Sequence, residues 1–537
     1  MACLPLFLYI FQIYVIIQQH MNKLVLTIDF GTQSARAGLF NKSGDIVALV
    51  KMQYEKPYIS VQKGYAEQDP NYYVDILKKG LKKLTSENKD RLNDIVGATI
   101  TTFRDSSVQL DKDLKPLRNC ILWLDQRTAQ VKEKTPFLHS LLFSLVGMKD
   151  AVELNRKRTM AHWIKENEPE IWAKTYKYVN ISTYLTYILT GNLVDSASSM
   201  TGHYPIHFRK RQWYKEGAMK GRIYGVPNSM LCELKQPGED LGVIQDDFAK
   251  EVGLPLGIRL IASGSDKACE TVGLGALNPS TGAISYGTAS SIEITNSKYY
   301  EPEPFLPAYP AAVPGLYNME VQVYRGYWML TWFAKEFATE LFDEVKLTQQ
   351  TVEELADEKL SNIPPGSDGL VLQPYWGPGL SRPLSKGAII GFSDIHTKYH
   401  LYRAIIEGIA YALREGMHGI EKKQRGKVKK LMISGGGSQS DAVCQITADI
   451  FGLPVSRVQT FETTSLGAAI CTFLALGEFE SIDVALKCMS HVTQTFMPDK
   501  ETHKQYNFLY KKAYVHLYPK LKDVYKSLKK YNDKYVK

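Results

Sequence analysis

Asp29, Gly31 and Thr32 lie close together between two apolar runs, in the stretch TIDFGTQSARAGLF (27–40). This order of residues predicts a strand, a tight turn and a second strand. Glycine lets a backbone approach a partner closely, and hydroxyls such as those of Thr32 and Ser34, beside backbone N–H groups, suit phosphate oxygens. A carboxylate at the strand end could hold a cation or a water near that phosphate. An ordinary hairpin turn gives the same pattern, so this stretch alone does not decide.

The same pattern occurs a second time in GAISYGTASSIEIT (282–295), with Gly287 and Thr288 in the turn. Two such hairpins, each opening a long α/β stretch, predict two related domains that offer phosphate-binding turns to one cleft. Shortly before the second copy, Asp266 lies in a glycine- and serine-rich loop ahead of a small-residue helix. Asp is favoured at helix N-caps. A cap can also be a catalytic acid, so both roles stay open for Asp266.

A third glycine cluster, Gly435–Gly437, lies between an apolar strand and a helix that begins near Ser440. Backbone N–H groups at a helix N-terminus attract anions, and glycines allow a flat ring to lie against the backbone. The spacing GGGSQS, deep in the C-terminal half, does not fit the GxGxxG of a dinucleotide-binding first turn. The cluster therefore indicates a nucleotide site, with a purely structural glycine turn as the alternative.

The composition is that of a globular protein with room for two or more domains: 537 residues, 44% hydrophobic and 23% charged. The seven cysteines are odd in number, irregularly spaced and without a CxxC pair. This argues against a disulfide framework and against a zinc site. It favours the reducing cytoplasm as the location.

The net charge of +9 is concentrated at the C-terminal end, where residues 500–537 hold eleven lysines and three acidic residues. This segment also has apolar residues at helical spacing. We expect a helical region docked through that stripe with its lysines in water, and therefore neither a nucleic-acid nor a membrane partner. The stripe consists of Tyr506, Tyr510, Tyr514, Leu517, Leu521, Val524 and Leu528.

Residues 1–20 are apolar for about fifteen residues, short of the ~20 needed to span a bilayer. No Lys or Arg precedes this run and no small-residue cleavage site follows it, unlike in a secretory signal. We interpret residues 1–20 as a mis-assigned start or a short apolar extension, with Met21 as the natural start. A membrane anchor is the alternative.

With its three loops in this order, the sequence resembles the FGGY family of carbohydrate kinases, within the actin and Hsp70-like ATPase superfamily. The resemblance extends from about residue 23 to 490. The family's N-terminal signature normally has Lys three residues before a Trp, whereas Met160 precedes Trp163 here, which indicates a divergent subfamily. Further family-like segments are GYAEQDPNYY (64–73), GAIIGFSDIHTKYHLYRAIIE (387–407) and TTSLGAAICTFLALG (463–477).

The resemblance implies an α/β fold of two actin-like (ribonuclease H-like) domains around a hinged cleft for ATP and substrate. The implied domains are 21–275 on the substrate side and 276–490 on the nucleotide side, followed by the basic helical tail 491–537. The implied activity is ATP- and Mg²⁺-dependent transfer of the γ-phosphate to a primary hydroxyl of a pentulose, a pentitol or a glycerol-like polyol, by a chain that could form a homodimer. Two alternatives are a sugar-independent ATPase switch, as in actin and Hsp70, and a kinase of a linear signalling polyol.

The resemblance also implies a role for individual residues. Asp266 would be the catalytic base and would contact the substrate, and Asp29 would lie near Mg²⁺. Arg104 and Asp105 occupy the place of the family's substrate-reading pair. This pair resembles the Arg-Glu of glycerol kinases, but its acid is one methylene shorter. A surface salt bridge between Arg104 and Asp105 is the alternative. Trp123 and Asp125 would complete the substrate pocket. The implied ATP-binding residues are Gly31, Thr32, Gln33, Ser34, Arg36, Gly287, Thr288, Gly435, Gly436, Gly437, Ser440 and Asp441.

Overall fold

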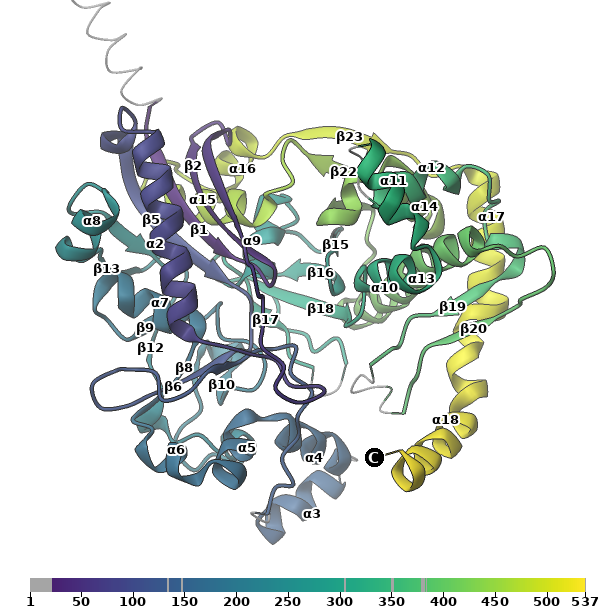
Figure 1. The fold of residues 1–537 in the computed structure, drawn as a ribbon, viewed down its shortest axis with the longest axis horizontal. Coiled ribbons are helices and arrows are strands. Elements are labelled where there is room, and N and C mark those ends of the chain that lie inside the picture. Colours follow the sequence, from purple (N-terminus) through teal and green to yellow (C-terminus); the bar gives the residue numbers. More distant parts are fainter. Residues whose placement is uncertain are drawn as a thin grey trace, which may run out of the picture. The chain divides into compact units, whose positions relative to one another are not determined.

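The computed structural model describes residues 22–132, 135–145, 148–303, 306–348, 352–377, 382 and 384–536 (Figure 1). The interpretation of residues 1–20 concerns a segment outside this range. Residue contacts divide the chain into two compact units. The first unit holds the described part of Met1–Gly273 with Tyr309–Leu316 and Glu462–Ser490, and the second holds Leu274–Ala308, Tyr317–Phe461 and His491–Lys537. The predicted boundary at 275–276 lies two residues beyond Gly273, and Glu462–Ser490 groups with the first unit.

The first unit is built on a six-stranded sheet in the order β13-β14-β5-β1-β2-β3. Strand β1 is central and buried along its whole length, which explains its unbroken apolar run. It pairs antiparallel with β2 and parallel with β5, while β14 runs parallel to β5. The strands are β1 (Leu24–Phe30), β2 (Ser34–Asn41), β3 (Ile46–Gln53), β5 (Ile95–Thr102), β13 (Asp240–Val243) and β14 (Arg259–Ile261).

The second unit repeats this arrangement in the order β18-β16-β15-β21-β22-β23. Strand β15 pairs antiparallel with β16 and parallel with β21, and β22 runs parallel to β21. The two predicted Gly-Thr hairpins are therefore equivalent: each joins the central strand of its sheet to an antiparallel neighbour. The strands are β15 (Thr281–Tyr286), β16 (Ser290–Asn296), β18 (Tyr317–Val323), β21 (Lys430–Ser434), β22 (Val455–Val458) and β23 (Val492–Phe496).

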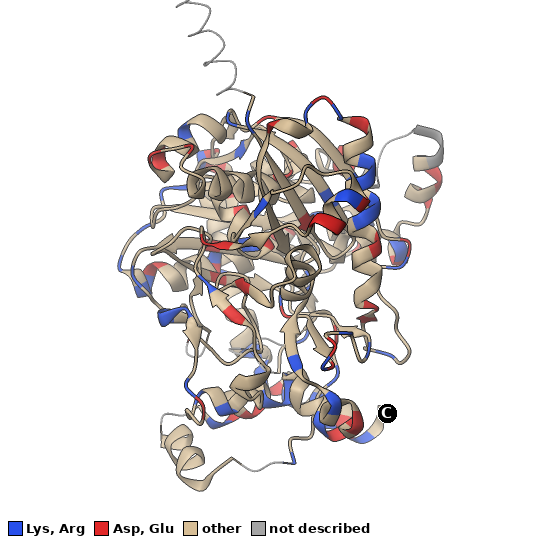
Figure 2. Ribbon diagram, turned by 90° about the vertical axis from the view of Figure 1, so that its left-hand side faces the viewer, with Lys and Arg blue, Asp and Glu red and all other residues tan. Residues whose placement is uncertain are grey.

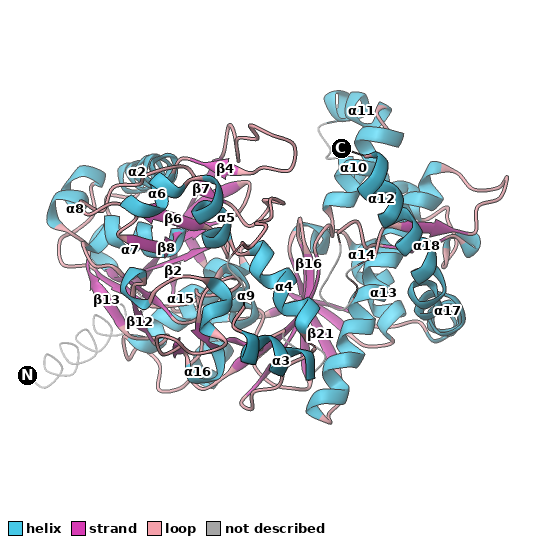
Figure 3. Ribbon diagram, turned by 90° about the horizontal axis from the view of Figure 1, so that it is seen from below, coloured by secondary structure: helices cyan, strands magenta, loops and turns pink. Residues whose placement is uncertain are grey.

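Helices and short strands complete each unit (Figure 3). The first unit contains β4 (Glu67–Gln68), α2 (Pro70–Glu87), β6 (Ser107–Leu110), β7 (Cys120–Ile121), α3 (Phe137–Leu145), α4 (Lys149–Arg158), α5 (Met160–Asn167), α6 (Pro169–Lys174), β8 (Lys177–Asn180), α7 (Ile181–Thr190), β9 (Val194–Ser196), β10 (Ile206–His207), β11 (Gln212–Trp213), β12 (Glu233–Lys235), α8 (Asp246–Val252), α9 (Asp266–Gly273), β17 (Tyr309–Pro310), α15 (Thr463–Ala475) and α16 (Ile482–Met489). The second contains α10 (Trp328–Phe337), α11 (Glu340–Thr348), α12 (Val352–Leu360), β19 (Val371–Gln373), β20 (Ala388–Ile390), α13 (Lys398–Gln424), α14 (Asp441–Phe451), α17 (Lys500–Leu509) and α18 (Val515–Tyr535).

Helices α9 and α15 of the first unit cross with their backbones almost in contact. A Cβ atom on Gly467 would lie 1.8 Å from the carbonyl oxygen of Cys269, and one on Gly273 would lie 2.0 Å from that of Thr463. The small-residue helix noted in the sequence is therefore required by this crossing. The crossing fixes the helix that begins at Asp266.

The C-terminal region is helical, as predicted, but its stripe is only partly docked. Tyr506, Tyr510 and Tyr514 are buried in the second unit, whereas Val524 and Leu528 are exposed. Tyr510 and Tyr514 are the first and last residues of a π-helical turn. Across the described ranges, no helix is both long enough and apolar enough to span a bilayer.

Candidate active site

The first Gly-Thr turn joins β1 to β2 through a backbone bond from Gly31 N to Ser34 O of 3.0 Å. Gly31 does not have a positive φ, but a Cβ atom would make tight contacts there, 3.2 Å from Ser34 O and 3.3 Å from Arg36 Nη1. The hydroxyl of Thr32 accepts a hydrogen bond from Trp123 Nε1 at 3.1 Å. Gln33 is exposed at the tip of the turn. The turn and Trp123, predicted separately as parts of the phosphate and substrate sites, are thus in contact.

Asp29 lies at the end of β1, opposite Arg36 on β2, and its side chain is buried. Its Oδ1 atom accepts no hydrogen bond from the described residues. Burial raises the pKa of Asp29 to about 7; the charge of Arg36 opposes this, and the carboxylates of Asp266, Glu462 and Glu270 add to it. Glu462 pairs with Arg36, with 2.9 Å between Oε2 and Nε.

This environment fits a bound cation. A buried carboxylate oxygen without a donor, near further carboxylates, is the kind of group that Mg²⁺ stabilises in its ionised form. Within the part of the chain that the structure describes, no three His, Cys, Asp or Glu side chains are arranged to bind a metal by themselves. Phosphate and water oxygens would have to supply the remaining ligands, as Mg²⁺ commonly requires.

We expect Asp29→Asn to remove a pH-dependent loss of stability in the ligand-free protein. A folded-state pKa raised above the unfolded value means that Asp29 favours folding below pH 4 and loses this contribution as the pH rises through about 7. The quantity to follow is the difference in the free energy of unfolding, Asn variant minus original protein. This difference should be about 1–3 kcal/mol larger at pH 8 than at pH 5. Denaturant titrations at both pH values measure this. The exposed Asp75→Asn is the control, and a pH-independent difference would contradict the expectation.

Asp266 is the first residue of α9. Its Oδ1 atom accepts a hydrogen bond from Lys267 N at 2.8 Å and lies 3.8 Å from Arg104 Nε. The side chain is 27% exposed, so a ligand can reach it. Burial raises its pKa, against the charges of Arg104 and Lys267. Asp266 thus combines the predicted position at a helix start with a partly exposed carboxylate that faces Arg104.

Arg104 and Asp105 contact different partners among the described residues. Arg104 faces Asp266 and lies over the ring of Tyr309, 5.8 Å from its centroid. Asp105 instead binds His203, accepting from its backbone N at 2.9 Å and lying 2.7 Å from its Nδ1. Burial would raise the pKa of Asp105, but the charge and hydrogen bonds of His203 hold it below its ordinary value.

The Asp105–His203 pair was not predicted. Asp105 has a positive φ of 53°, and a Cβ atom on Gly202 would lie 2.2 Å from the Cγ of Asp105. The segment around His203 is far from Asp105 in the sequence and has no pattern of its own that would have identified it. Glu462 and Glu270 were missed for the same reason, because their proximity to Asp29 depends on the tertiary fold.

Asp125 has a structural role, contrary to its predicted place in the substrate pocket. Its side chain is 1% exposed, and its oxygens accept from Ala66 N at 2.6 Å and from the backbone and guanidinium of Arg127 at 2.7–2.9 Å. These four donors use its acceptor sites. Arg127 also pairs with Glu67, and its guanidinium lies 4.5 Å from the centroid of the Trp163 ring. Trp163, the tryptophan of the divergent family signature, therefore packs on this buried ion pair.

In the second unit, Gly287 and Thr288 follow β15 and are partly exposed. Their carbonyl oxygens accept from Tyr327 N at 3.0 Å and Trp328 N at 3.4 Å, which fixes the start of α10 behind the turn. Gly435 packs against the same turn: with φ of 82° and ψ of 175° it has a conformation almost confined to glycine. A Cβ atom there would lie 2.6 Å from Tyr286 O.

The other residues of the glycine cluster differ in what surrounds them. Gly436 is exposed, and no atom lies within 4 Å of the position that a Cβ atom would take there, whereas a Cβ atom on Gly437 would lie 2.4 Å from the Tyr327 ring. Ser440 caps α14, accepting from Val443 N at 3.1 Å. Asp441 is exposed and pairs with Arg457. Gly436 therefore offers the open surface of this cluster.

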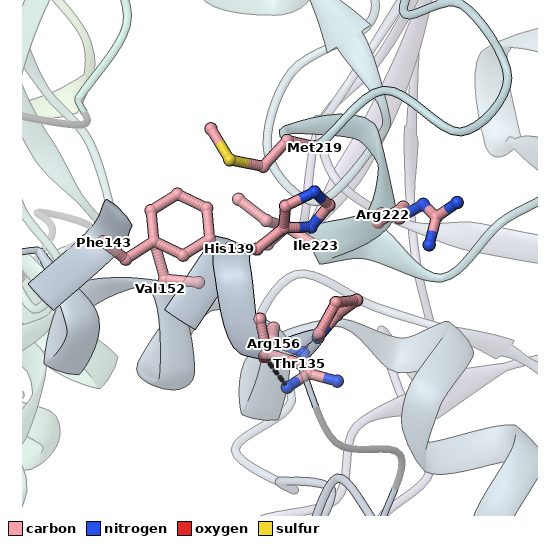
Figure 4. Close-up of a pocket in the computed structure, with 9 residues that line it drawn as sticks. Thr135, His139, Phe143, Val152, Arg156, Met219, Arg222 and Ile223 are labelled. Carbon is pink, nitrogen blue, oxygen red and sulfur yellow. Dashed lines mark hydrogen bonds between the residues drawn. The ribbon is translucent and has the colours of Figure 1, made fainter. Parts of the chain in front are cut away.

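A small cavity in the first unit lies between α3, α4 and the segment 219–223 (Figure 4). Arg156 donates a hydrogen bond to Thr135 at its edge. None of the predicted site residues lines this cavity, so it is not assigned to the active site.

Two units with the same strand order, each with a Gly-Thr turn after its central strand, form the two-domain actin-like fold. The N-terminal and C-terminal domains of the FGGY family of carbohydrate kinases match residues 24–273 and 282–476. The chain belongs to this family, and it is a phosphotransferase that acts on an alcohol group of a sugar or polyol.

Individual relatives agree with the family match. The chain is 28% identical over 516 residues to the xylulose kinase of Lactococcus lactis, covering 95% of this chain and 99% of that one. It is 28% identical over 509 residues to the glycerol kinase of Thermococcus onnurineus, covering 90% and 96%. The crystal structure of the xylulose kinase from Lactobacillus acidophilus has the same fold, with a TM-score of 0.78 at 22% identity over 94% of this chain and 100% of that one.

Proposed function

We propose that this kinase transfers the γ-phosphate of ATP to a primary hydroxyl of a small sugar or polyol, with Asp266 as the base. The observation that carries this proposal is the Asp266 carboxylate: it is reachable, begins a rigid helix and faces Arg104. A carboxylate within hydrogen-bond reach of the attacking hydroxyl aligns it and takes its proton as the new bond forms. A non-catalytic ATPase switch would have no need for this arrangement.

Arg104, Asp105 and His203 supply the proposed recognition of substrate hydroxyls. Arg104 donates only, and Asp105, held ionised by His203, accepts only. Trp123, tied to Thr32, gives an apolar face for the carbon side of the substrate. The same chemistry serves a pentulose, a pentitol or glycerol, as in the xylulose and glycerol kinases to which the chain is similar.

For the nucleotide, we propose that the turns at Gly31-Thr32 and Gly287-Thr288 bind the phosphates and that the Gly435–Gly437 cluster binds the adenine. Both turns are partly exposed, and Gly436 presents open backbone. Asp29 would hold Mg²⁺ with phosphate and water oxygens; the ion neutralises charge on the transferring phosphoryl group. Ser440 and Asp441 are held by contacts within α14 and with Arg457, which favours a supporting role for them.

The compartment proposed for the enzyme is the reducing cytoplasm. The six described cysteines have free thiols, and five of them are buried. A homodimer remains part of the proposal to be tested by solution mass measurement.

Substrate-dependent formation of ADP tests the proposed reaction. Purified protein would be assayed with glycerol, erythritol, pentitols, xylulose, ribulose and gluconate in the presence of MgATP. One compound should raise the rate well above the rate without substrate. ATP hydrolysis that is rapid and equal with every compound would favour the ATPase switch instead.

Two neighbouring glycines give a matched test of the adenine site. We expect Gly436→Ala to leave the melting temperature unchanged and to raise the KM for ATP about tenfold or more, because its Cβ atom meets no protein atom but projects from the open surface. Gly435→Ala should instead lower the free energy of unfolding by about 1–3 kcal/mol, because its backbone conformation excludes a side chain. Steady-state kinetics and melting curves measure both. An unchanged KM in Gly436→Ala would contradict the adenine assignment.

A further inference from the structure

The last helix, α18, carries an apolar stripe that faces away from the unit to which the helix is attached. Its residues recur at alternating intervals of three and four, which places them on one face of an α-helix. Their exposed fractions are substantial: 50% for Val524, 43% for Leu528, 57% for Tyr531 and 61% for Tyr535. Tyr525, on a different face, is buried. We call these four exposed residues the outer stripe.

A π-helical turn at Tyr510–Tyr514 leads from α17 into α18. In this turn Val515 N donates to Tyr510 O, five residues back rather than four. The wider turn rotates the helix that follows by about 90–100° relative to a continuous α-helix. Tyr525 lies three α-turns beyond Tyr514 and therefore on the same face, and its hydroxyl donates to Gln373 Oε1 at 2.6 Å. Val524 and Leu528 lie to one side of this inward face, so this end of the stripe that the sequence predicted to be docked is exposed.

The helix that carries the outer stripe is rich in lysine; Figure 2 shows lysine and arginine in blue. Residues 520–535 contain six lysines and two aspartates. The two aspartates are paired within the helix, Asp523 with Lys526 and Asp533 with Lys529. The helix therefore keeps a net positive charge of four beside its apolar face. The lysines outside these pairs are Lys520, Lys522, Lys530 and Lys534.

We propose that the outer stripe of α18 binds the surface of a membrane that carries anionic phospholipids. A basic helix with one apolar face lies in the plane of such an interface, its apolar side chains among the acyl chains and its lysines at the phosphates. Tyr531 and Tyr535 suit this position, since a tyrosine ring is apolar and its hydroxyl remains hydrated. Each lysine near an anionic surface strengthens binding by about fivefold.

Charge and area argue against a second copy of this chain as the partner of the outer stripe. Two copies of α18 side by side would bring two strongly positive helices together. Four side chains that are each about half exposed also fall well short of the about 800 Å² per partner that stable protein interfaces bury. Adsorption to a charged surface needs no such area, because the lysines contribute from both flanks.

Flotation of the full chain with lipid vesicles tests the proposal. We expect binding to vesicles of phosphatidylcholine with 30% phosphatidylserine, none to phosphatidylcholine alone, and a steep loss of binding at high salt. The variant Val524→Ser/Leu528→Ser/Tyr531→Ser should lower the partition coefficient at least tenfold. The variant Lys522→Gln/Lys530→Gln/Lys534→Gln should do the same while keeping the stripe.

Helix α3 provides the matched control. It exposes Leu138, Leu141 and Leu142 but contains no charged residue, so Leu138→Ser/Leu141→Ser/Leu142→Ser should bind vesicles like the original chain. Melting curves verify that all variants are folded. Absence of binding, equal binding to neutral vesicles, or binding that the α18 variants do not change would overturn the proposal. A dimer in light scattering that the stripe variant abolishes would also overturn it, in favour of a second copy as the occupant.

Discussion

Replacing Asp266 by Asn is expected to lower kcat for substrate phosphorylation by about 10²–10⁴-fold, because the amide cannot accept the proton of the attacking hydroxyl. The amide oxygen can still accept the bond from Lys267 N, and Ser265 Oγ, which accepts from Ala268 N at 3.4 Å, is unchanged, so the start of α9 and the fold should be preserved. The KM for ATP should change little. Steady-state kinetics with the compound identified in the substrate panel measure both constants.

A second helix-initiating aspartate serves as the control for this variant. Asp246 begins α8 and is exposed, so Asp246→Asn should keep full activity. If Asp266→Asn retained a kcat within a few-fold of the original enzyme, Asp266 would not be the base. The Asp105–His203 pair would then be the next acid–base candidate, since it lies beside Arg104 at the same site.

Gly467→Ala is expected to destabilise the first unit by about 3 kcal/mol or more, the upper range for an overpacked site. The added Cβ atom would lie 1.8 Å from the Cys269 carbonyl, so α9 and α15 must separate over their whole crossing. Because α9 begins at Asp266, activity should fall even at temperatures where the chain remains folded. Calorimetric melting together with kcat measured at low temperature would separate the two effects.

Gly419→Ala is the matched substitution with the opposite expected sign. Gly419 also lies inside a helix, α13, but no atom is within 4 Å of its Cβ position. Alanine should therefore be neutral or stabilise by about 0.5–1 kcal/mol, from helix propensity alone. If both substitutions had the same small effect, the close helix crossing would not contribute to stability as described.

The sequence was informative wherever local chemistry determines structure. The Gly-Thr hairpins predicted two equivalent sheets, since a strand, a turn and a strand follow from neighbouring residues. Gly435 and Gly467 also lie in segments that the sequence analysis singled out. Glycine is required at these positions by close contacts with Tyr286 and Cys269, which are far away in the chain.

Other site features could not be read from the sequence because they depend on partners. Asp125 has the same local signals as a ligand-binding aspartate, yet the position of Arg127 makes it structural. His203 gains its role only when Gly202 packs beneath Asp105. The C-terminal stripe was correctly predicted to be helical and apolar, but Val524 and Leu528 are exposed because the inward face of α18 runs through Tyr525, which binds Gln373.

The first unit is built from segments that lie far apart in the chain, and this affects the order of folding during synthesis. Helix α9 is made early, yet the helix it packs against, α15, follows almost 190 residues later. Until the ribosome has passed residue 475, the apolar and glycine-lined side of α9 lacks its partner, while most of the second unit has already been synthesised. Contacts between residues so distant in the chain form late and slowly. The nascent chain therefore completes the packing around Asp266 only near the end of translation, and it is exposed to chaperones and proteases throughout that interval.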